Sequence, residues 1–369
     1  MGRISHTAVF KQLGSAWLTR RVQYVILFVT ARCNLLCKHC FYIDEILDAK
    51  NKKELSLEEY ERIAQHMGSL MNVSITGGEP FIRKDLADIV LAFRKHAGTL
   101  FFNITTNGLI EKRTLETIES IFTKDPKTNI RLGVSIDGLE DVHDITRDRK
   151  GAFRETINTL HQLVPLRNRF EGLTVHISTT LTKHNKGQIR DLIDFTRHNL
   201  DVDAHYLGFI RGDVYDPDYK AVTLEDYKQA NAYLKHKWVT KNPYQNAQNL
   251  VNVLMTSVNE HILATDEYFI PCVAGEKMIT IDEEGRVKPC EILQQIGITP
   301  YIMGDLRRHN YDIYKVLATE EARSIRERIL RERCHCTFEC ANQSSVAFSL
   351  PSLGKAAGLH VIQRLKRQS

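Results

Sequence analysis

Short runs rich in β-branched and aromatic residues recur through the first two thirds of the chain, and each run predicts a strand. The segments between them place apolar residues at helical spacing, and the first begins with Ser56 and Glu59, which can form a capping box. We expect strands at residues 24–30, 72–76, 100–105, 131–136, 174–180 and 204–210, and helices at 56–70, 86–96, 115–122, 153–163 and 189–199. Strands separated by helices pair in parallel, because the helix carries the chain back across the sheet.

Six such strand–helix units fill residues 24–215. A closed barrel of eight units takes about 250 residues, so six units need about 190. The length therefore predicts an α/β fold that begins with a partial (β/α)6 barrel.

The pattern changes after Pro217. Helices are expected over 223–237, opened by Thr223 and Asp226, and over 247–264. A β-hairpin follows, with strands at 278–282 and 286–289 joined through Gly285, and then a helix over 312–331. We therefore predict a small α+β domain behind the barrel. The predicted divisions are a basic amphipathic segment (1–23), the barrel (24–215), a helical linker (216–270), the small domain (271–345) and a basic amphipathic tail (346–369).

The composition is that of a soluble protein, with 369 residues of which 43% are hydrophobic and 26% are charged. No run approaches the roughly 18–20 apolar residues that cross a bilayer, and the N-terminus lacks a signal-peptide pattern. A cytoplasmic location is expected, where thiols stay reduced, so the eight cysteines are interpreted as ligands or catalysts before disulfides.

The positive charge is concentrated at the two ends of the chain. Residues 1–24 and 341–369 carry +4 each without an acidic residue, which leaves −3 for the rest of a protein whose net charge is +5. That distribution argues against a nucleic-acid-binding body. Residues 9–18 and 353–365 are amphipathic as well as basic, so they can lie peripherally on an anionic membrane. The alternatives are packing on their own domain and self-association.

The first cysteine group, Cys33, Cys37 and Cys40, follows the first expected strand with the spacing C-x3-C-x2-C. Three thiolates on so short a loop can hold three irons of a [4Fe–4S] cluster and leave the fourth iron open for a ligand. The alternatives are a zinc site with His39 as the fourth ligand, and disulfides.

The second expected strand ends in Gly77-Gly78-Glu79-Pro80. Two glycines allow the backbone to approach a ligand closely, and Glu79 offers an acceptor for an ammonium group. Both this turn and the first cysteine group lie at carboxyl ends of parallel strands, where barrel active sites form, so we expect them to share one mouth. By itself the turn is also compatible with a plain structural role.

The second cysteine group lies in the predicted small domain. Cys272 and Cys290 flank the hairpin, and Cys334, Cys336 and Cys340 follow the last expected helix. Five thiols are enough for one further cluster with one to spare, and the sequence does not tell which of the last three is the spare. A structural zinc site is the alternative.

Together the cysteine triplet and the Gly-Gly-Glu-Pro turn resemble the radical S-adenosylmethionine (SAM) superfamily. The resemblance implies that Cys33, Cys37 and Cys40 hold a [4Fe–4S] cluster whose open iron binds the amino and carboxylate groups of SAM. It implies that Gly77, Gly78 and Glu79 contact the amino group, and that Asn107 and Ser135, which end the third and fourth strands, contact its ribose or carboxylate. Ordinary strand-capping turns are the alternative for Asn107 and Ser135.

The segments His143-Asp144 and Gly151-Ala152-Phe153 also resemble the subfamily that carries auxiliary clusters. The second cysteine group resembles the SPASM and twitch modules of that subfamily, so the resemblance covers about residues 24–345. It implies that an auxiliary [4Fe–4S] cluster is bound among Cys272, Cys290, Cys334, Cys336 and Cys340. A full SPASM module has seven or more cysteines for two clusters, whereas this chain has five.

By this resemblance the protein is an enzyme that cleaves SAM reductively, and the 5′-deoxyadenosyl radical takes a hydrogen atom from the substrate. A low-potential donor such as flavodoxin or ferredoxin is then required. The first hypothesis is oxidation of a sugar-like or lipid-like small molecule with help from the auxiliary cluster. The alternative is a maturase that modifies a ribosomally made peptide, and the few residues ahead of Cys33 argue against the leader-binding domain that many maturases carry. A third hypothesis is a two-cluster electron carrier.

The substrate cannot be identified from the residues. Tyr42, Arg211 and Asp213 are candidates for the lining of the mouth, and surface or turn roles are their alternatives.

Overall fold

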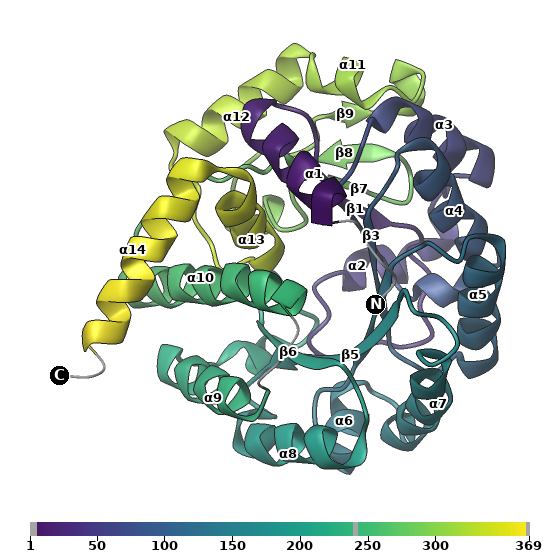
Figure 1. The fold of residues 1–369 in the computed structure, drawn as a ribbon, viewed down its shortest axis with the longest axis vertical. Coiled ribbons are helices and arrows are strands. Elements are labelled where there is room, and N and C mark those ends of the chain that lie inside the picture. Colours follow the sequence, from purple (N-terminus) through teal and green to yellow (C-terminus); the bar gives the residue numbers. More distant parts are fainter. Residues whose placement is uncertain (1–5, 239–242, 367–369) are drawn as a thin grey trace.

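The computed structural model describes residues 6–238 and 243–366. Its strands form one nine-stranded sheet within these ranges, in the order β6-β5-β4-β3-β2-β1-β7-β8-β9. Strands β1 to β6 are parallel and curve around the centre of the molecule without closing (Figure 1). The strands are β1 (Tyr24–Phe28), β2 (Asn72–Thr76), β3 (Phe101–Thr106), β4 (Ile130–Ser135), β5 (Leu173–Leu181), β6 (Ala204–Phe209), β7 (Met278–Ile281), β8 (Arg286–Lys288) and β9 (Gly304–Asp305). The predicted α/β fold with a partial barrel is confirmed.

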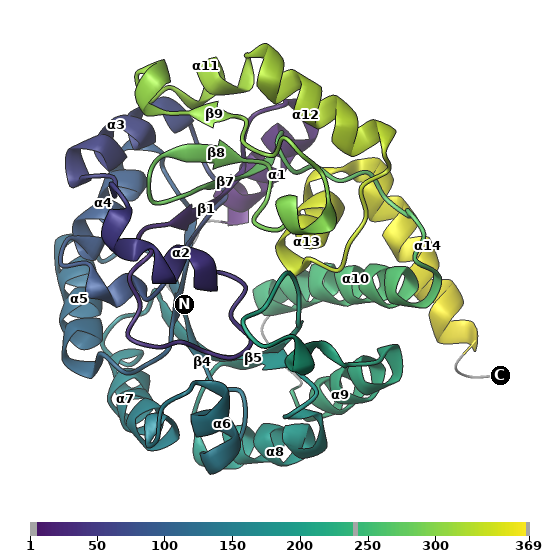
Figure 2. The same cartoon turned by 180° about the vertical axis from the view of Figure 1, so that it is seen from behind.

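The helices between the parallel strands lie around the outside of the sheet (Figures 1 and 2). Side chains of β5 alternate between fully and partly buried, because one face packs on these helices and the other faces the barrel interior. The α-helices are α1 (His6–Leu18), α2 (Ile43–Leu47), α3 (Leu57–Met67), α4 (Leu86–His96), α5 (Glu111–Lys124), α6 (Glu140–Thr146), α7 (Ala152–Leu166), α8 (Ile189–Asn199), α9 (Leu224–Lys237), α10 (Pro243–Thr265), α11 (Ile313–Leu317), α12 (Glu320–Arg331), α13 (Glu339–Phe348) and α14 (Leu350–Lys366).

Local sequence signals account for several helix boundaries. The expected capping boxes are present at the start of α3, where Ser56 pairs with Glu59, and at the start of α9, where Thr223 pairs with Asp226. The prediction of a single helix over 312–331 is wrong. It is divided into α11 and α12, because the side chain of Thr319 accepts a hydrogen bond from the Ala322 amide and starts a new helix.

The hairpin of the predicted small domain extends the barrel sheet. Strand β7 pairs in parallel with β1, with Tyr24 opposite Met278, and β8 and β9 add antiparallel strands beyond it. The hairpin is thus anchored on the first barrel strand, although about 250 residues separate the two in sequence. The domain boundaries drawn from the sequence stay predictions.

The two basic ends both pack on their own chain. Ala16 of α1 is fully buried, and the indole nitrogen of Trp17 donates to the carbonyl of Ala347, 2.9 Å away. Helix α14 packs on α10 and α13 around Val258, Val346 and Ala356. Its outer face is different, since its large apolar side chains there are more than half exposed: Val361, Ile362 and Leu365. Within the described ranges, no helix is long and apolar enough to cross a membrane.

Candidate active site

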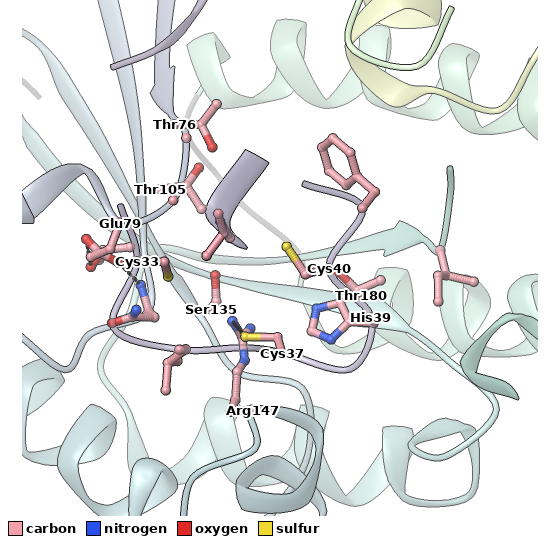
Figure 3. Close-up of a pocket in the computed structure, with 18 of the residues that line it drawn as sticks. Cys33, Cys37, His39, Cys40, Thr76, Glu79, Thr105, Ser135, Arg147 and Thr180 are labelled. Atoms are coloured by element: carbon pink, nitrogen blue, oxygen red, sulfur yellow. Dashed lines mark hydrogen bonds between the residues drawn. The ribbon is translucent and has the colours of Figure 1, made fainter. Parts of the chain in front are cut away.

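A pocket that is partly open to solvent lies at the carboxyl ends of the barrel strands, and the space between its walls is roughly 820 Å³ with the open solvent included. Its wall includes all three cysteines of the first group and the Gly-Gly-Glu turn, which were predicted to share one mouth, and it also includes Asn107 and Ser135. The remaining lining residues are Leu35, His39, Phe41, Ile46, Thr76, Thr105, Thr106, Arg147, Thr180, Phe209, Ile210 and Arg211. Figure 3 shows that the three sulfur atoms end around the same space.

The loop that carries the cysteines is held from two sides. The amide of Lys38 donates to the carbonyl of Thr146 at 2.9 Å, and the amide of Tyr215 donates to the carbonyl of Cys40 at 3.1 Å. All eight cysteines lie in the described residues and none is in a disulfide, which overturns that alternative for this structure. Burial raises the pKa of Cys33 and of Cys40 to about 12. A bound metal ion reverses this effect, because it deprotonates a coordinating thiol.

A buried charge pair lies directly beneath this loop. The guanidinium of Arg147 pairs with the carboxylate of Asp137 and donates to the sulfur of Cys37 at 3.7 Å (Figure 3). His39 points its Nε2 atom toward Asp137 at 3.5 Å, and burial lowers the pKa of His39 to about 4. Arg147 therefore supplies positive charge next to one sulfur, and His39 is engaged with Asp137.

The zinc alternative receives no support from the positions of the donors. Among residues 6–238 and 243–366, no three histidine, cysteine or carboxylate side chains converge closely enough to bind one metal ion. A four-iron cluster does not require such convergence, because each thiolate bonds a different iron.

The two glycines of the turn allow close packing against the cysteine loop. A Cβ atom on Gly77 would lie 2.3 Å from the carbonyl oxygen of Thr30, and one on Gly78 would lie 2.1 Å from that of Arg32. The amides of Gly78 and Glu79 donate to the same two carbonyls, each at 2.8 Å. From the sequence, these glycines were predicted to let the backbone approach a ligand. The structure gives a second reason for glycine at both positions, because a side chain there would block the contact between the ends of β1 and β2.

Glu79 is 1% exposed and joins the end of β2 to the end of β3. Its carboxylate accepts hydrogen bonds from the Asn107 amide at 2.7 Å, the Thr106 hydroxyl at 2.9 Å and the Phe81 amide at 3.2 Å. Burial raises its pKa to about 7, although these three donors act in the opposite direction. A carboxylate has about four lone-pair positions, so one position is left for a further donor.

The predicted contacts of Asn107 and Ser135 with a cofactor stay predictions. Both residues line the pocket. The side chain of Asn107 donates to Asn34 at 2.8 Å and accepts from the Leu109 amide at 3.0 Å, which is the turn role weighed as its alternative. Thr76, Thr105 and Thr180 also line the pocket and were not singled out in the sequence. The sequence feature that could have identified them is their position at the end of a strand, on the side that faces the barrel interior.

Two further residues of this region were not predicted as site residues, although Asp144 belongs to a segment that resembles the subfamily. Asp144 accepts hydrogen bonds from the amides of Gly151 and Phe153, so it ties α6 to the start of α7. Arg147 lies four residues after His143, one helical turn further along, and that spacing was the available signal.

Of the three side chains proposed for the mouth, only Arg211 lines the pocket. The hydroxyl of Tyr42 instead donates to Glu283 of the hairpin turn, and its ring packs on Phe28. Asp213 is exposed and lies outside the pocket lining. The expectation for Tyr42 and Asp213 is therefore wrong.

The five remaining cysteines belong to the predicted small domain, and electrostatic influence links four of them. The pKa of Cys290 is raised by burial and then by Cys272, Cys336 and Cys334. The pKa of Cys334 is raised by burial and then by Cys272 and Cys336, and that of Cys336 is raised by burial and then by Cys272.

Cys340 has a different environment. After burial, the groups that shift its pKa most are Glu291, Arg211, Tyr24 and Glu339. The hydroxyl of Tyr24 donates to its sulfur at 3.4 Å and also shares a hydrogen bond of 2.7 Å with Ser74 on β2. Cys340 thus contacts the barrel, whereas the other four thiols are linked by electrostatic influence.

Comparison with protein families finds one match over each cysteine group. A model of the Radical SAM superfamily matches residues 27–196, and a model of the SPASM iron–sulfur cluster-binding domain matches residues 272–341. The chain belongs to the radical SAM superfamily. Its radical SAM domain contains the whole first cysteine group, and its SPASM domain contains the whole second group.

Relatives of this radical SAM enzyme act in different pathways. The chain is 31% identical over 173 residues to Fe-coproporphyrin III synthase of Methanosarcina barkeri, covering 46% of this chain and 40% of the relative. It is 24% identical over 332 residues to the subtilosin biosynthesis protein AlbA of Bacillus subtilis, covering 85% of this chain and 65% of the relative. The chain therefore spans less than two thirds of the length of these curated relatives.

The fold of this radical SAM enzyme is shared with solved structures. Streptococcus suis SuiB bound to S-adenosylmethionine superposes with a TM-score of 0.59 at 19% identity, covering 87% of this chain and 71% of that chain.

The two domains imply a [4Fe–4S] cluster, SAM and auxiliary iron–sulfur chemistry, together with a reductant and a substrate. The donors present fit these groups. Three free thiols face one pocket, an arginine lies next to one of them, and a buried carboxylate with an open lone-pair position lines the same wall. Cys33, Cys37 and Cys40 could hold the first cluster, and the five C-terminal thiols could hold the second.

Proposed function

We propose that this radical SAM enzyme modifies a ribosomally made peptide, with net oxidation of the substrate. The observation that carries the proposal is the match to AlbA, a bacteriocin biosynthesis protein, because it extends over 85% of this chain. The match to Fe-coproporphyrin III synthase covers 46%. A bacteriocin is a ribosomally made antibacterial product, so the relatives favour the peptide hypothesis over the small-molecule hypothesis that the sequence analysis placed first.

At the pocket, Cys33, Cys37 and Cys40 are the proposed ligands of the first cluster. When bound there, the cluster and SAM supply a 5′-deoxyadenosyl radical that takes a hydrogen atom from a C–H bond. Arg147 offsets negative charge at the Cys37 sulfur. The open lone-pair position of Glu79 would accept a hydrogen bond from the SAM ammonium, and Asn107 and Ser135 would contact the ribose or carboxylate of SAM.

For the auxiliary cluster we assign Cys272, Cys290, Cys334 and Cys336 as ligands. The influence of Cys272, Cys334 and Cys336 on Cys290 supports this assignment, and the hydrogen bond between Cys340 and Tyr24 of the barrel supports its role as the spare thiol. Bound there, the auxiliary cluster would supply an acceptor for the electron of the substrate radical, and the proton would pass to water. Together with the first abstraction, this would remove two hydrogen atoms from the substrate. A flavodoxin or ferredoxin provides the electron for SAM cleavage.

A peripheral contact with an anionic membrane is proposed for the outer face of α14. The exposed side chains of Val361, Ile362 and Leu365 support it, together with the absence of acidic residues after position 340. Helix α1 contributes less, because part of its apolar face is already packed on the chain.

The test of the main proposal is an anaerobic assay with the reconstituted enzyme, SAM and dithionite. Short precursor peptides encoded beside the gene are the candidate substrates, and GTP, on which the related GTP 3′,8-cyclases act, serves as the small-molecule arm. We expect a peptide to lose about 2 Da per 5′-deoxyadenosine formed, because one hydrogen atom and then one electron and one proton are removed. Conversion of GTP with all peptides unchanged would refute the proposal.

A further inference from the structure

Arg211 is the residue of the pocket wall that reaches the SPASM domain. It follows β6 and lines the pocket with the first cysteine group. Its Nε and Nη2 atoms donate to one carboxylate oxygen of Glu291, at 3.1 and 2.7 Å. Its Nη1 atom donates to Glu339 at 3.1 Å. One guanidinium therefore joins the barrel to two segments of the small domain.

Both acidic partners are direct sequence neighbours of cysteines. Glu291 follows Cys290, and Glu339 precedes Cys340 at the start of α13. The second carboxylate oxygen of Glu339 accepts from the Phe209 amide at 2.8 Å, so the end of β6 contacts α13 twice. These contacts fix the position of the C-terminal cysteines relative to the last barrel strand.

The same guanidinium also reaches the first cysteine group. It lies 5.3 Å from the ring centre of Phe41, which follows Cys40, and 4.8 Å from that of Phe338. Arg211 thus touches a residue adjacent to a cysteine of each group. Contacts of this kind hold a loop in one orientation only when all partners are in place.

The charges around Arg211 argue against binding of a substrate anion. The side chains of Glu291 and Glu339 are 6% and 19% exposed, and both pair with the one guanidinium. Two carboxylates and one cation leave a net negative charge, which repels a third anion. Loss of the cation would leave both carboxylates unpaired beside the SPASM cysteines.

We propose that Arg211 is a positioning residue that fixes the auxiliary cluster against the barrel mouth and offsets two carboxylates, one next to the proposed ligand Cys290 and one next to the spare thiol Cys340. This inference rests on the auxiliary cluster of the proposed function, but it does not depend on the substrate being a peptide. Extra negative charge near an iron–sulfur cluster favours its oxidised form, so removal of Arg211 lowers the reduction potential of the auxiliary cluster.

The test compares Arg211→Met, Arg211→Lys and the double variant Arg211→Met with Glu291→Gln in the reconstituted holoenzyme. Iron content is measured first, and the auxiliary potential is then measured by redox titration followed by electron paramagnetic resonance. We expect about eight irons per chain in every variant. The potential should fall in Arg211→Met, return toward the wild-type value in the double variant, and change least in Arg211→Lys, which keeps the charge.

The second measurement is the amount of product formed for each SAM molecule that is cleaved. We expect product per 5′-deoxyadenosine to fall about tenfold in Arg211→Met, which corresponds to roughly 1.4 kcal/mol. The matched control is Arg94→Met, because Arg94 is similarly exposed and pairs with Asp125 on the outer surface. An Arg211→Met enzyme with eight irons and an unchanged potential would overturn the inference. A shifted potential in an enzyme that converts no peptide would leave it standing and refute only the proposed substrate.

Discussion

The substitution Glu79→Gln tests how the pocket recognises the SAM ammonium. The carboxylate accepts three hydrogen bonds, and two of them, from Thr106 and Phe81, end on the same oxygen. A glutamine can keep this oxygen as its carbonyl. Its amide nitrogen must then face the Asn107 amide, which now donates to the second carboxylate oxygen at 2.7 Å. Two donors would face each other, and the negative charge would be lost.

The expected losses follow from these contacts. A buried donor left without an acceptor costs about 1–3 kcal/mol, so the free energy of unfolding should fall by about that amount. A hydrogen bond between charged groups contributes roughly 1.5–3 kcal/mol. Loss of the one to the ammonium should weaken SAM binding about tenfold to a hundredfold, at roughly 1.4 kcal/mol per decade. Iron content should not change, because Glu79 is not a proposed iron ligand.

The pKa of Glu79 adds a dependence on pH that the variant lacks. Burial raises this pKa from 4.5 to about 7, so folding favours the protonated carboxyl. The associated stability is fully present below about pH 4.5 and is lost as the pH rises through 7. SAM binding has the opposite trend, because the ammonium requires the carboxylate, and wild-type affinity should therefore rise between pH 6 and about pH 8.

The assay measures SAM affinity by equilibrium dialysis and thermal unfolding at several pH values, in the wild type, in Glu79→Gln and in the control Glu116→Gln. Glu116 is 61% exposed on α5, so its amide should behave as the wild type does. Equal affinity and an equal pH profile in Glu79→Gln and the wild type would show that the Gly-Gly-Glu turn has only a structural role.

Four other predictions concern the two clusters, the Gly-Gly-Glu turn and the outer face of α14. The wild type should hold about eight irons per chain, falling to about four when the triplet cysteines are replaced together by alanine, and four in the wild type would exclude an auxiliary cluster. Cys336→Ala should lose about four irons while Cys340→Ala keeps all eight, and the reverse result would reassign the spare thiol. Gly78→Ala should destabilise the protein by several kcal/mol in chemical denaturation, because its Cβ would lie 2.1 Å from the Arg32 carbonyl oxygen. The outer face of α14 should bind vesicles of anionic lipid, and serines at its three exposed apolar positions should abolish co-sedimentation while Leu330→Ser, at a position 54% exposed on α12, does not.

The sequence by itself determined the features that depend on local pattern. The alternation of strands and helices predicted the partial barrel, since burial on an outer helix layer imposes a recognisable spacing of apolar residues. Both capping boxes were readable, because their partners are three residues apart. The cysteine triplet and the Gly-Gly-Glu turn were predicted to share one mouth, because the carboxyl ends of parallel strands meet there, and the pocket contains both.

Only the tertiary structure decided what depends on contacts between distant segments. Cys340 was indistinguishable from Cys334 and Cys336 in sequence, and its separation comes from a hydrogen bond with Tyr24, more than 300 residues away. Arg211 had been a candidate for the substrate, yet Glu291 and Glu339 occupy its guanidinium. Such pairings arise when β7 docks on β1 and brings the C-terminal segments to the barrel. No spacing along the chain encodes them, because hydrogen bonds and ion pairs act through distance in space.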